Sequence, residues 1–239
     1  DKLFMEYIHL PQKPDGPAAI AFLKGEYERI YTRLSELRGR KPSALKTAKP
    51  DADALRRSIS LYNVNRDLHR RLYRLRGDRP QDVPTAELSL LTRAGGLLPV
   101  EEHNRMLEAA YADFSARRRK PRDGIRVVVE GSFCEQPPLE LLTMLEQAGC
   151  AVVDDDLLLG RRWFEEDIPV DGDPLRALAE SYINRAHYSS VSHDWRKTRY
   201  QRLIEKVRNS GAIAVVFCIA KFCEPALLDY PVFKNTLER

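Results

Sequence analysis

The side chains of this sequence with the most versatile chemistry are four cysteines, at positions 134, 150, 218 and 223. Cys150 and Cys218 fall in apolar runs typical of buried strands, where cysteine behaves as a small hydrophobic residue. Cys134 and Cys223 instead fall in polar segments close to proline, just after a predicted strand has ended. We therefore expect a functional role for Cys134 and Cys223 and a packing role for the other two.

Three chemistries compete for these thiols, and the residues alone leave the choice open. A structural zinc site wants four nitrogen or sulfur ligands and usually a CxxC pair, which this sequence lacks. A nucleophilic cysteine needs a histidine base; His187 and His193 lie in a long excursion, but nothing in the pattern brings them to the thiols. Iron–sulfur clusters accept varied spacings, and Cys218 and Cys223 match Cys-x4-Cys weakly. The residues favour a redox or cluster site but supply too few ligands for one.

Three further polar features have a simpler interpretation. The run Asp154–Asp156 offers carboxylates to a hard cation. Adjacent aspartates more commonly cap the next helix or face solvent, and we expect one of these two roles instead of a metal site. His103, in the first turn of a predicted helix, is expected at the surface. The basic segment 117–124 contains proline and glycine, so we interpret it as a solvated linker between two parts of the chain rather than a phosphate site.

The second half of the sequence predicts an α/β unit that positions these residues. Its alternating elements are a strand at 125–130, a helix at 139–148, a strand at 150–153, helices from 172 and at 195–209, a strand at 212–219 and helical turns after Pro225. This order predicts a doubly wound, mainly parallel sheet with helices on both faces. In such a sheet the carboxyl ends of the strands share one edge, where ligands bind. That edge would collect Ser132, Cys134 and Glu135, then Asp154–Asp156, then Lys221, Cys223 and Glu224.

The first half is predicted to be helical. A short segment at 2–10 is compatible with a strand, and apolar periodicity then predicts helices from 18 to 38, from 51 to 77, from 85 to 95 and after Pro99. The polar stretch Tyr62–Arg66 lies within the second of these helices, where we expect a solvated face or a hydrogen-bonding face between helices rather than a packing or recognition role. We predict a helical region at 1–124, which completes an absent N-terminal α/β domain, and a C-terminal α/β domain at 125–239.

Composition excludes several classes of protein. The chain has 239 residues, of which 43% are hydrophobic and 31% charged, and no apolar run approaches the length of a membrane span. Four cysteines are too few for a disulfide scaffold, which suggests a reducing cytoplasm. The net charge of +4 comes without a basic, aromatic stripe, so we expect neither nucleic acid nor a membrane as a partner. The sequence begins at Asp1, and we expect it to be a fragment.

Several long motifs resemble one known family. They are Gly131–Leu139 (GSFCEQPPL), Gly149–Asp156 (GCAVVDDD), Gly172–Leu175 (GDPL), Lys221–Asp229 (KFCEPALLD), and, in the helical half, Tyr62–Arg66 (YNVNR) with Arg93–Gly95 and Leu98–His103. Together they identify the chain as similar to a core subunit of the benzoyl-CoA reductase / 2-hydroxyacyl-CoA dehydratase family. The resemblance covers nearly the whole chain. The Gly131–Leu139 motif and the Asn-x-Asn-Arg context are more similar to the benzoyl-CoA reductases, which reduce an aromatic acyl-CoA.

The resemblance implies a cofactor and partners. It implies a [4Fe-4S] cluster on three cysteines, of which Cys223 matches the third; the other two are expected outside this chain, which would be truncated at both ends. Cys134 and Glu135 are then candidate catalytic residues, and Ser132, Glu135 and Glu224 candidate substrate contacts. It further implies a homologous second core subunit, an ATP-hydrolysing iron–sulfur partner that donates electrons, and a cytoplasmic enzyme. A 2-hydroxyacyl-CoA dehydratase subunit and a non-catalytic partner subunit are the alternatives.

Overall fold

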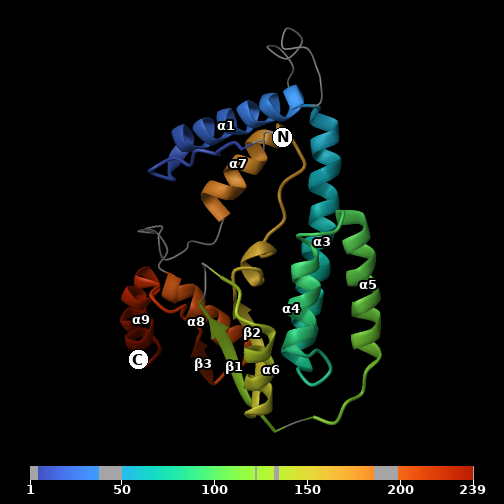
Figure 1. Ribbon diagram of the computed structural model, residues 1–239, viewed down its shortest axis with the longest axis vertical. Helices are drawn as coiled ribbons and strands as arrows, with labels where there is room; N and C mark the ends of the chain where they lie inside the picture. Colours follow the sequence, from blue (N-terminus) through green and yellow to red (C-terminus); the bar gives the residue numbers. More distant parts are fainter. Residues whose placement is uncertain (1–4, 38–49, 122, 132–134, 186–198, 239) are drawn as a thin grey trace. The chain divides into compact units, whose positions relative to one another are not determined.

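The computed structural model describes five stretches of the chain, residues 5–37, 50–121, 123–131, 135–185 and 199–238 (Figure 1). The chain divides into two compact units, one of Asp1–Asn63 with Glu166–Ala186 and one of Val64–Glu165 with His187–Arg239. The domain boundary that we predict after Gly124 is a different kind of division, because it separates domains of the whole protein. It stays a prediction. None of the described helices is both long and apolar enough to cross a membrane.

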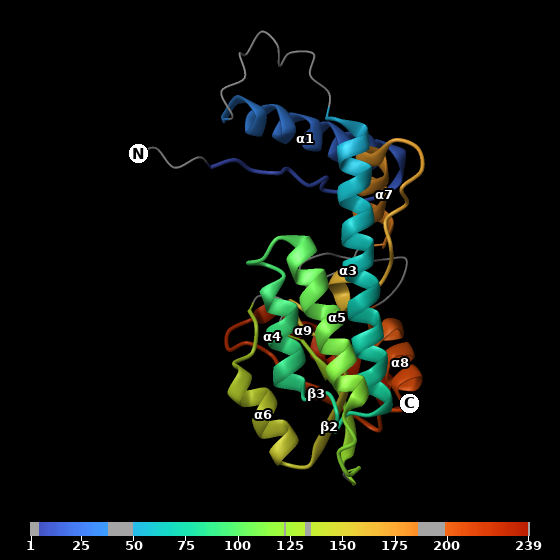
Figure 2. The same cartoon turned by 90° about the vertical axis from the view of Figure 1, so that its right-hand side faces the viewer.

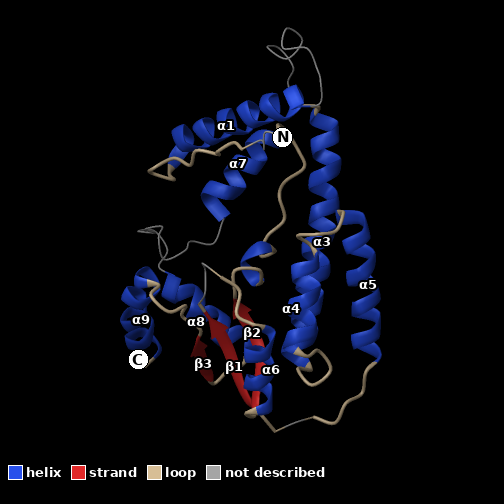
Figure 3. Cartoon of the chain, viewed as in Figure 1, coloured by secondary structure: helices blue, strands red, loops and turns tan. Residues whose placement is uncertain are grey.

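The second unit is built on a parallel sheet of three strands within the described residues. They are β1 (Ile125–Glu130), β2 (Cys150–Asp156) and β3 (Ala214–Phe217), in the order β2-β1-β3, with β1 in the centre (Figure 3). Their valine-rich sequences suit buried strands. The β1–β2 register shifts between Val127 and Val128, so that Val128 faces Asp154 instead of Val153. β2 is therefore bulged and runs through all three aspartates.

Helices cover both faces of this sheet, which confirms the predicted doubly wound α/β fold. On one face, α6 (Leu139–Gln147) packs Leu142 against Val127, Val129 and Val152. On the opposite face, α8 (Arg199–Ser210) and α9 (Glu224–Leu237) pack Leu203 and Phe233 against Val128. Strand side chains alternate between faces, so odd and even valines of β1 belong to two separate cores.

A helical layer packs beside the sheet within the same unit. It consists of the second part of α3 (Ala52–Asp78), α4 (Thr85–Ala94) and α5 (Val100–Ala116), which run side by side (Figure 2). Fully buried leucines from each helix, Leu72, Leu88 and Leu107, form its core. α4 has no capping side chain of its own, and Glu146 of α6 accepts a hydrogen bond from the Thr85 N–H at 2.7 Å instead. This bond ties the helical layer to the sheet's covering helix.

The first unit is helical. It pairs α1 (Gly16–Leu37) with α7 (Pro174–Arg185) through Ala19, Leu23, Ala179 and Ile183. Lys24 and Asp173 form an ion pair at 2.7 Å between the two elements. The amide of Asn63 donates to the Ile168 carbonyl and accepts from its N–H, at 2.9 and 3.0 Å, so its partner is an irregular segment and not another helix, unlike the predicted contact.

Four predicted elements differ from the structure. Residues 5–10 form no strand, because their hydrogen bonds go to side chains of α1. β2 extends to Asp156 instead of ending at 153, since its aspartates find buried partners. The apolar residues of 212–219 extend beyond β3, and the two helical stretches predicted after Pro225 form one helix that includes Pro231. The remaining helices begin and end within a few residues of their predicted limits.

Arg126 joins three elements of this unit through its guanidinium. Nε donates to the Gly211 carbonyl at 3.1 Å, and Nη2 donates to the carbonyls of Gly77 and Ser210. These carbonyls lie at the carboxyl ends of α3 and α8, where positive charge is favourable.

We predict that Arg126→Met lowers the free energy of unfolding by about 1–3 kcal/mol, because charge-assisted hydrogen bonds to two helix ends are lost. Urea denaturation of the purified protein measures the loss. Arg176→Met is the matched control, since the exposed Arg176 contacts only Glu180 by an i,i+4 ion pair. Equal stability of the two variants would contradict the capping role.

Candidate functional site

The carboxyl ends of the three strands lie level with one another. Glu130 at the end of β1 is the register partner of Asp156 on β2 and of Phe217 on β3. The segments that leave these strands therefore begin at one edge of the sheet, as predicted. We call this edge, with the segments at 131–138 and 218–224, the carboxyl edge.

Two of these segments are in direct backbone contact. The Cys218 N–H donates to the Glu130 carbonyl at 2.8 Å, which extends the β1–β3 pairing by one bond. Gly131 follows with φ +115°, and a Cβ at this position would lie 2.6 Å from the Cys218 carbonyl oxygen. Only glycine fits that conformation and that approach, so the chain leaves β1 directly against the start of the 218–224 segment.

Cys223 is held at the carboxyl edge by its backbone. Its N–H donates to the Ala220 carbonyl and its carbonyl accepts from the Leu227 N–H, both at 3.0 Å. It is the N-cap of α9, and the residue before it, Phe222, has φ +65° and an 82% exposed side chain. The Cys223 side chain is half-buried, so the thiol is fixed in place but still reachable by a ligand.

The other predicted site residues divide into two groups. Glu135 and Glu224 are exposed at the carboxyl edge. Ser132 and Cys134, like His187 and His193, lie outside the described residues.

The two strand cysteines are half-buried and pack against the core on the α6 face. Burial raises the pKa of the Cys218 thiol, as expected of a packing residue. Cys150 lies at the amino end of β2, opposite the carboxyl edge. Cys218, just after β3, packs against the core on the α6 face, so its packing gives no support to the weak Cys-x4-Cys match with Cys223.

The residues at this edge do not make a metal or cluster site by themselves. Among the described residues, no three histidine, cysteine, aspartate or glutamate side chains are grouped so as to hold a metal ion. Of the described residues at this edge, Cys223 presents a half-buried thiol. A cluster on this thiol would need ligands from elsewhere.

The aspartates of β2 are neither helix caps nor solvent-exposed, which corrects the prediction for them. Each is at most 3% exposed and has a cationic partner. We define the strand-end charge cluster as four carboxylates and four cations: Glu130, Asp154, Asp155, Asp156, Arg76, Arg161, Arg162 and Lys206. Because the formal charges balance, no net charge is left for a metal cation to neutralise, and the alternative of a cation site is not supported.

Asp155 is the most completely bonded member of the strand-end charge cluster. Its Oδ2 accepts from the Tyr73 hydroxyl at 2.9 Å and from Arg76 Nη2 at 2.8 Å, both on α3. Its Oδ1 accepts from two backbone N–H groups, of Leu157 and Arg161, at 3.4 Å. The Arg76 guanidinium stacks on the Tyr73 ring, 4.1 Å from its centroid. Asp155 thus anchors α3 to the end of β2.

Lys206 of α8 lies on the other side of the strand ends. Burial alone would lower its pKa, but the charges of Asp156 and Glu130 more than offset this and raise it. Lys206 therefore stays charged inside the protein. Sequence reasoning missed Lys206, because a lysine in an amphipathic helix is usually on its solvated face.

Asp154, in the same cluster, is affected in the opposite way. Burial raises the pKa of its carboxyl group, although the positive charge of Arg161, 2.8 Å away, lowers it in part.

A second buried polar group joins α3, α4 and α5. Asn65 Nδ2 donates to His103 Nδ1 at 2.9 Å and to Asn104 Oδ1 at 2.8 Å, and His103 Nε2 bonds the Leu91 carbonyl at 2.8 Å. His103 is 3% exposed, so its predicted surface position is wrong. His69 Nδ1 bonds the Asn65 carbonyl while its ring stacks on Phe164. The Asn65 part of the polar stretch is thus a structural contact between helices, as predicted.

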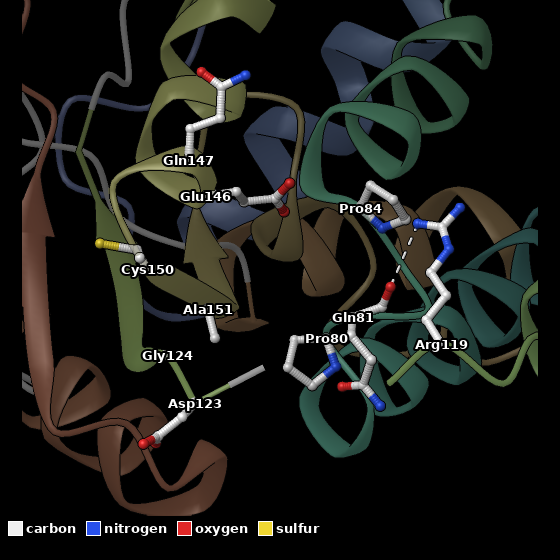
Figure 4. A pocket seen from close by; sticks show the side chains of 11 residues that line it. Pro80, Gln81, Pro84, Arg119, Asp123, Gly124, Glu146, Gln147, Cys150 and Ala151 are labelled. Carbon is white, nitrogen blue, oxygen red and sulfur yellow. Dashed lines mark hydrogen bonds between the residues drawn. The ribbon is translucent and has the colours of Figure 1, made fainter. Parts of the chain in front are cut away.

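A pocket of about 350 Å³ lies at the opposite edge of the sheet, next to Gly124, Cys150 and Ala151 (Figure 4). Figure 4 shows Glu146 pointing toward Pro84, while the side chains of Gln147 and Asp123 point away from it. In pockets that bind a ligand, the polar side chains that recognise the ligand converge on the pocket. Here the side chains of Gln147 and Asp123 do not. We therefore assign no binding role to this pocket and place the candidate site at the carboxyl edge.

Comparison with known proteins matches nearly the entire chain. Residues 2–239 match the family model described as 2-hydroxyglutaryl-CoA dehydratase, D-component. The chain is 36% identical over 233 residues to a benzoyl-CoA reductase subunit of Thauera aromatica, covering 97% of this chain and 58% of that protein. It is 32% identical over 229 residues to the beta subunit of lactoyl-CoA dehydratase of Anaerotignum propionicum, with 95% and 58% covered.

A more distant relative is the beta subunit of (R)-2-hydroxyglutaryl-CoA dehydratase of Acidaminococcus fermentans, 25% identical over 242 residues, with 100% of this chain and 61% of that protein covered. The chain thus spans about three-fifths of the length of the curated relatives it matches. The match extends over both compact units.

We predict that Asp155→Asn lowers the free energy of unfolding by about 3–5 kcal/mol, because it leaves the Arg76 guanidinium buried without a counter-charge. Urea denaturation measures the loss, and Asp53→Asn is the control, since Asp53 is 78% exposed in its ion pair with Arg56. The double variant Asp155→Leu/Arg76→Met should regain most of the stability. Asp155→Asn with the stability of the control would refute the anchoring role.

Stability should also depend on the protonation of His69. Burial lowers the pKa of its imidazole to about 4, below the usual 6.5. Between these values the unfolded chain binds a proton that the folded chain does not, so stability is complete above about pH 6.5 and falls as the pH drops toward 4.

The full loss from His69 amounts to about 3 kcal/mol. His69→Gln should flatten this part of the pH profile, measured by urea denaturation at pH 4 to 7. His9→Gln, which removes an exposed imidazole, should leave the profile as it is. Identical profiles for the parent and His69→Gln would contradict the prediction.

Proposed function

Because the chain belongs to the 2-hydroxyglutaryl-CoA dehydratase D-component family, we propose that it is part of a catalytic subunit of an enzyme complex that acts on CoA thioesters. We further propose the benzoyl-CoA reductase type, an oxidoreductase that reduces the ring of an aromatic acyl-CoA. The carboxyl edge, with Cys223, is the proposed site.

The observation that carries this proposal is the match to the benzoyl-CoA reductase subunit over 97% of the chain. At 36%, its identity exceeds the 32% and 25% found for the two dehydratase subunits. The family supports the broader class, acyl-CoA chemistry by a multi-subunit enzyme, and the order of identities favours the reductase within it.

Cys223 is proposed as one ligand of a [4Fe-4S] cluster. The thiol is half-buried and fixed by two backbone hydrogen bonds, and the other ligands would come from outside this chain. When bound, such a cluster supplies electrons of low potential. This chain's contribution is to hold one sulfur at a defined place on the edge.

The remaining residues of the carboxyl edge are proposed to bind the thioester. The exposed carboxylates of Glu135 and Glu224 can accept hydrogen bonds from amide N–H groups such as those of the pantetheine arm. Ser132 stays a candidate contact, and Cys134 and Glu135 stay candidate catalytic residues. The positive end of the α9 dipole also lies at this edge, which favours anionic groups of a ligand.

The proposed partners are a homologous second core subunit and an ATP-hydrolysing iron–sulfur protein that donates electrons. Both are supported by the family and by the naming of the relatives as subunits. ATP would be used by the partner and not by this chain. A cytoplasmic location is proposed with them.

The alternative is a 2-hydroxyacyl-CoA dehydratase subunit, a lyase. It is favoured by the description of the family model and by the lactoyl-CoA and 2-hydroxyglutaryl-CoA dehydratase relatives. Assays of one preparation of the full-length complex with benzoyl-CoA and with 2-hydroxyacyl-CoA thioesters decide between them. Turnover of a 2-hydroxyacyl-CoA alone would overturn the reductase assignment. A subunit that only supports its partner is a further alternative.

We predict that Cys223→Ser, introduced in the full-length complex, lowers the iron content and abolishes acyl-CoA turnover. Removal of one thiolate weakens or prevents cluster binding. Iron and sulfide analysis with the turnover assay, under anaerobic conditions, measures both effects. Cys150→Ala is the control, because Cys150 packs at the other edge of the sheet. A Cys223→Ser complex with the iron and activity of the parent would refute the ligand role.

A further inference from the structure

One lysine connects the ends of two strands beneath the carboxyl edge. Lys206 Nζ lies 3.8 Å from Glu130 Oε2 on β1 and 3.9 Å from Asp156 Oδ1 on β2. It also donates a hydrogen bond to the Asp155 carbonyl at 3.2 Å. The Lys206 side chain is 6% exposed, and those of Glu130 and Asp156 are 10% and 4% exposed. A single cation therefore holds acceptors from both strands inside the protein.

The strand pairing places two carboxylates side by side, and a cation between them offsets their repulsion. Glu130 and Asp156 are register partners on neighbouring strands, so their side chains lie on the same face, the face that α8 covers. Two like charges in that position repel each other and would push the strand ends apart. Asp156 has a second partner in Arg162, at 3.0 Å and 3.1 Å, whereas Lys206 alone of these cations spans the two strands.

The chain segments of the carboxyl edge begin next to the strand ends that Lys206 connects. Glu130 precedes Gly131, and the candidate residues at 132–135 follow in the sequence. The Glu130 carbonyl also accepts the Cys218 N–H, five residues before Cys223. A displacement of Glu130 would therefore move Gly131 and the start of the 218–224 segment.

We propose that Lys206 is a positioning residue for the carboxyl-edge site: it fixes the end of β1 against β2 and thereby sets Gly131 and the 218–224 segment that carries Cys223 and Glu224. The proposal rests on the proposed function only in that it takes this edge as the site. Lys206 acts through Glu130 and contacts no reacting group.

Stability alone is a poor reason for such a group of charges. Replacement of a buried ion pair by apolar side chains of similar volume is commonly neutral or stabilising, since the desolvation of the ions is avoided. Apolar side chains do not fix the position of one strand end relative to the other, because their contacts persist when the strands shift slightly. A variant that keeps stability but loses position can therefore separate the two roles.

The double variant Lys206→Met/Glu130→Met provides this separation. It removes the lysine and the β1 carboxylate together, leaves the net charge unchanged, and leaves Asp156 paired with Arg162. Lys206→Arg keeps a cation with several donors in the same place. The matched control is Lys234→Met, whose lysine is 53% exposed in an i,i+4 ion pair with Glu238 on α9.

Two measurements on the full-length complex test the proposal. Hydrogen exchange of the peptide that contains the Cys218 amide reports on the Glu130 contact and needs no substrate. Steady-state kinetics with the acyl-CoA that the parent complex turns over separates kcat from KM. Urea denaturation of the same preparations records stability.

We expect the double variant to unfold at the urea concentration of the parent, to exchange the Cys218 amide about tenfold faster, and to lose about tenfold in kcat with KM unchanged. Lys206→Arg should restore slow exchange and most of kcat, and Lys234→Met should match the parent. Parent-like exchange in the double variant would overturn the proposal. So would faster exchange throughout the sheet together with lower stability, which indicates a structural role only. A parent complex that turns over no acyl-CoA refutes the proposed function, while the exchange result still decides the role of Lys206.

Discussion

Burial of four carboxylates at the ends of two neighbouring strands is the constraint on which the second unit depends. Removal of each ion from water costs several kcal/mol, and the cost is offset only by close, well-bonded counter-charges. The strand-end charge cluster supplies counter-charges from three directions: Arg76 from α3 and Arg161 and Arg162 from the segment after β2, in close pairs, and Lys206 from α8 at the longer distances of 3.8 and 3.9 Å. The placement of these elements around the sheet therefore follows from electrostatics as well as from apolar packing.

The bulge in β2 decides which carboxylate meets which cation. In an unshifted register Glu130 would face Asp155, and alternation would turn Asp155 toward α8 and its two neighbours toward α3. The extra residue of β2, Val153, is skipped in the pairing between Val127 and Val128, which places Asp156 opposite Glu130 and Asp155 opposite Val129. Asp155 then reaches Tyr73 and Arg76, and Asp156 reaches Lys206. The bulge is therefore consistent with the observed pairings of all three aspartates.

Local features of the fold could be predicted from the sequence, whereas pairings across the chain could not. The valine run of β1, the capping carboxylate of Asp51 and the helix that ends before Gly95 all depend on neighbours within a few residues. Asp155 and Arg76 are 79 residues apart, and each alone is typical of a solvated surface. His103 was misplaced for the same reason, since its partner Asn65 is 38 residues away. Of the site, Cys223 could be predicted from its place after a strand, but the cations beneath it could not.

The site itself follows from two levels of constraint. Backbone contacts, the Gly131 approach to Cys218 and the bonds at Cys223, fix the chain where it leaves the strands. The charges beneath fix the strands themselves, because a salt-bridged end cannot slide without exposing an unpaired ion to a low-dielectric interior. An apolar core would give comparable stability and tolerate small shifts. In the proposed function the site would hold a thiolate ligand and a thioester in fixed relation, and misplacement by about 1 Å can cost about a hundredfold in rate. The strand-end charge cluster therefore belongs with the proposed chemistry more than with the stability of the fold.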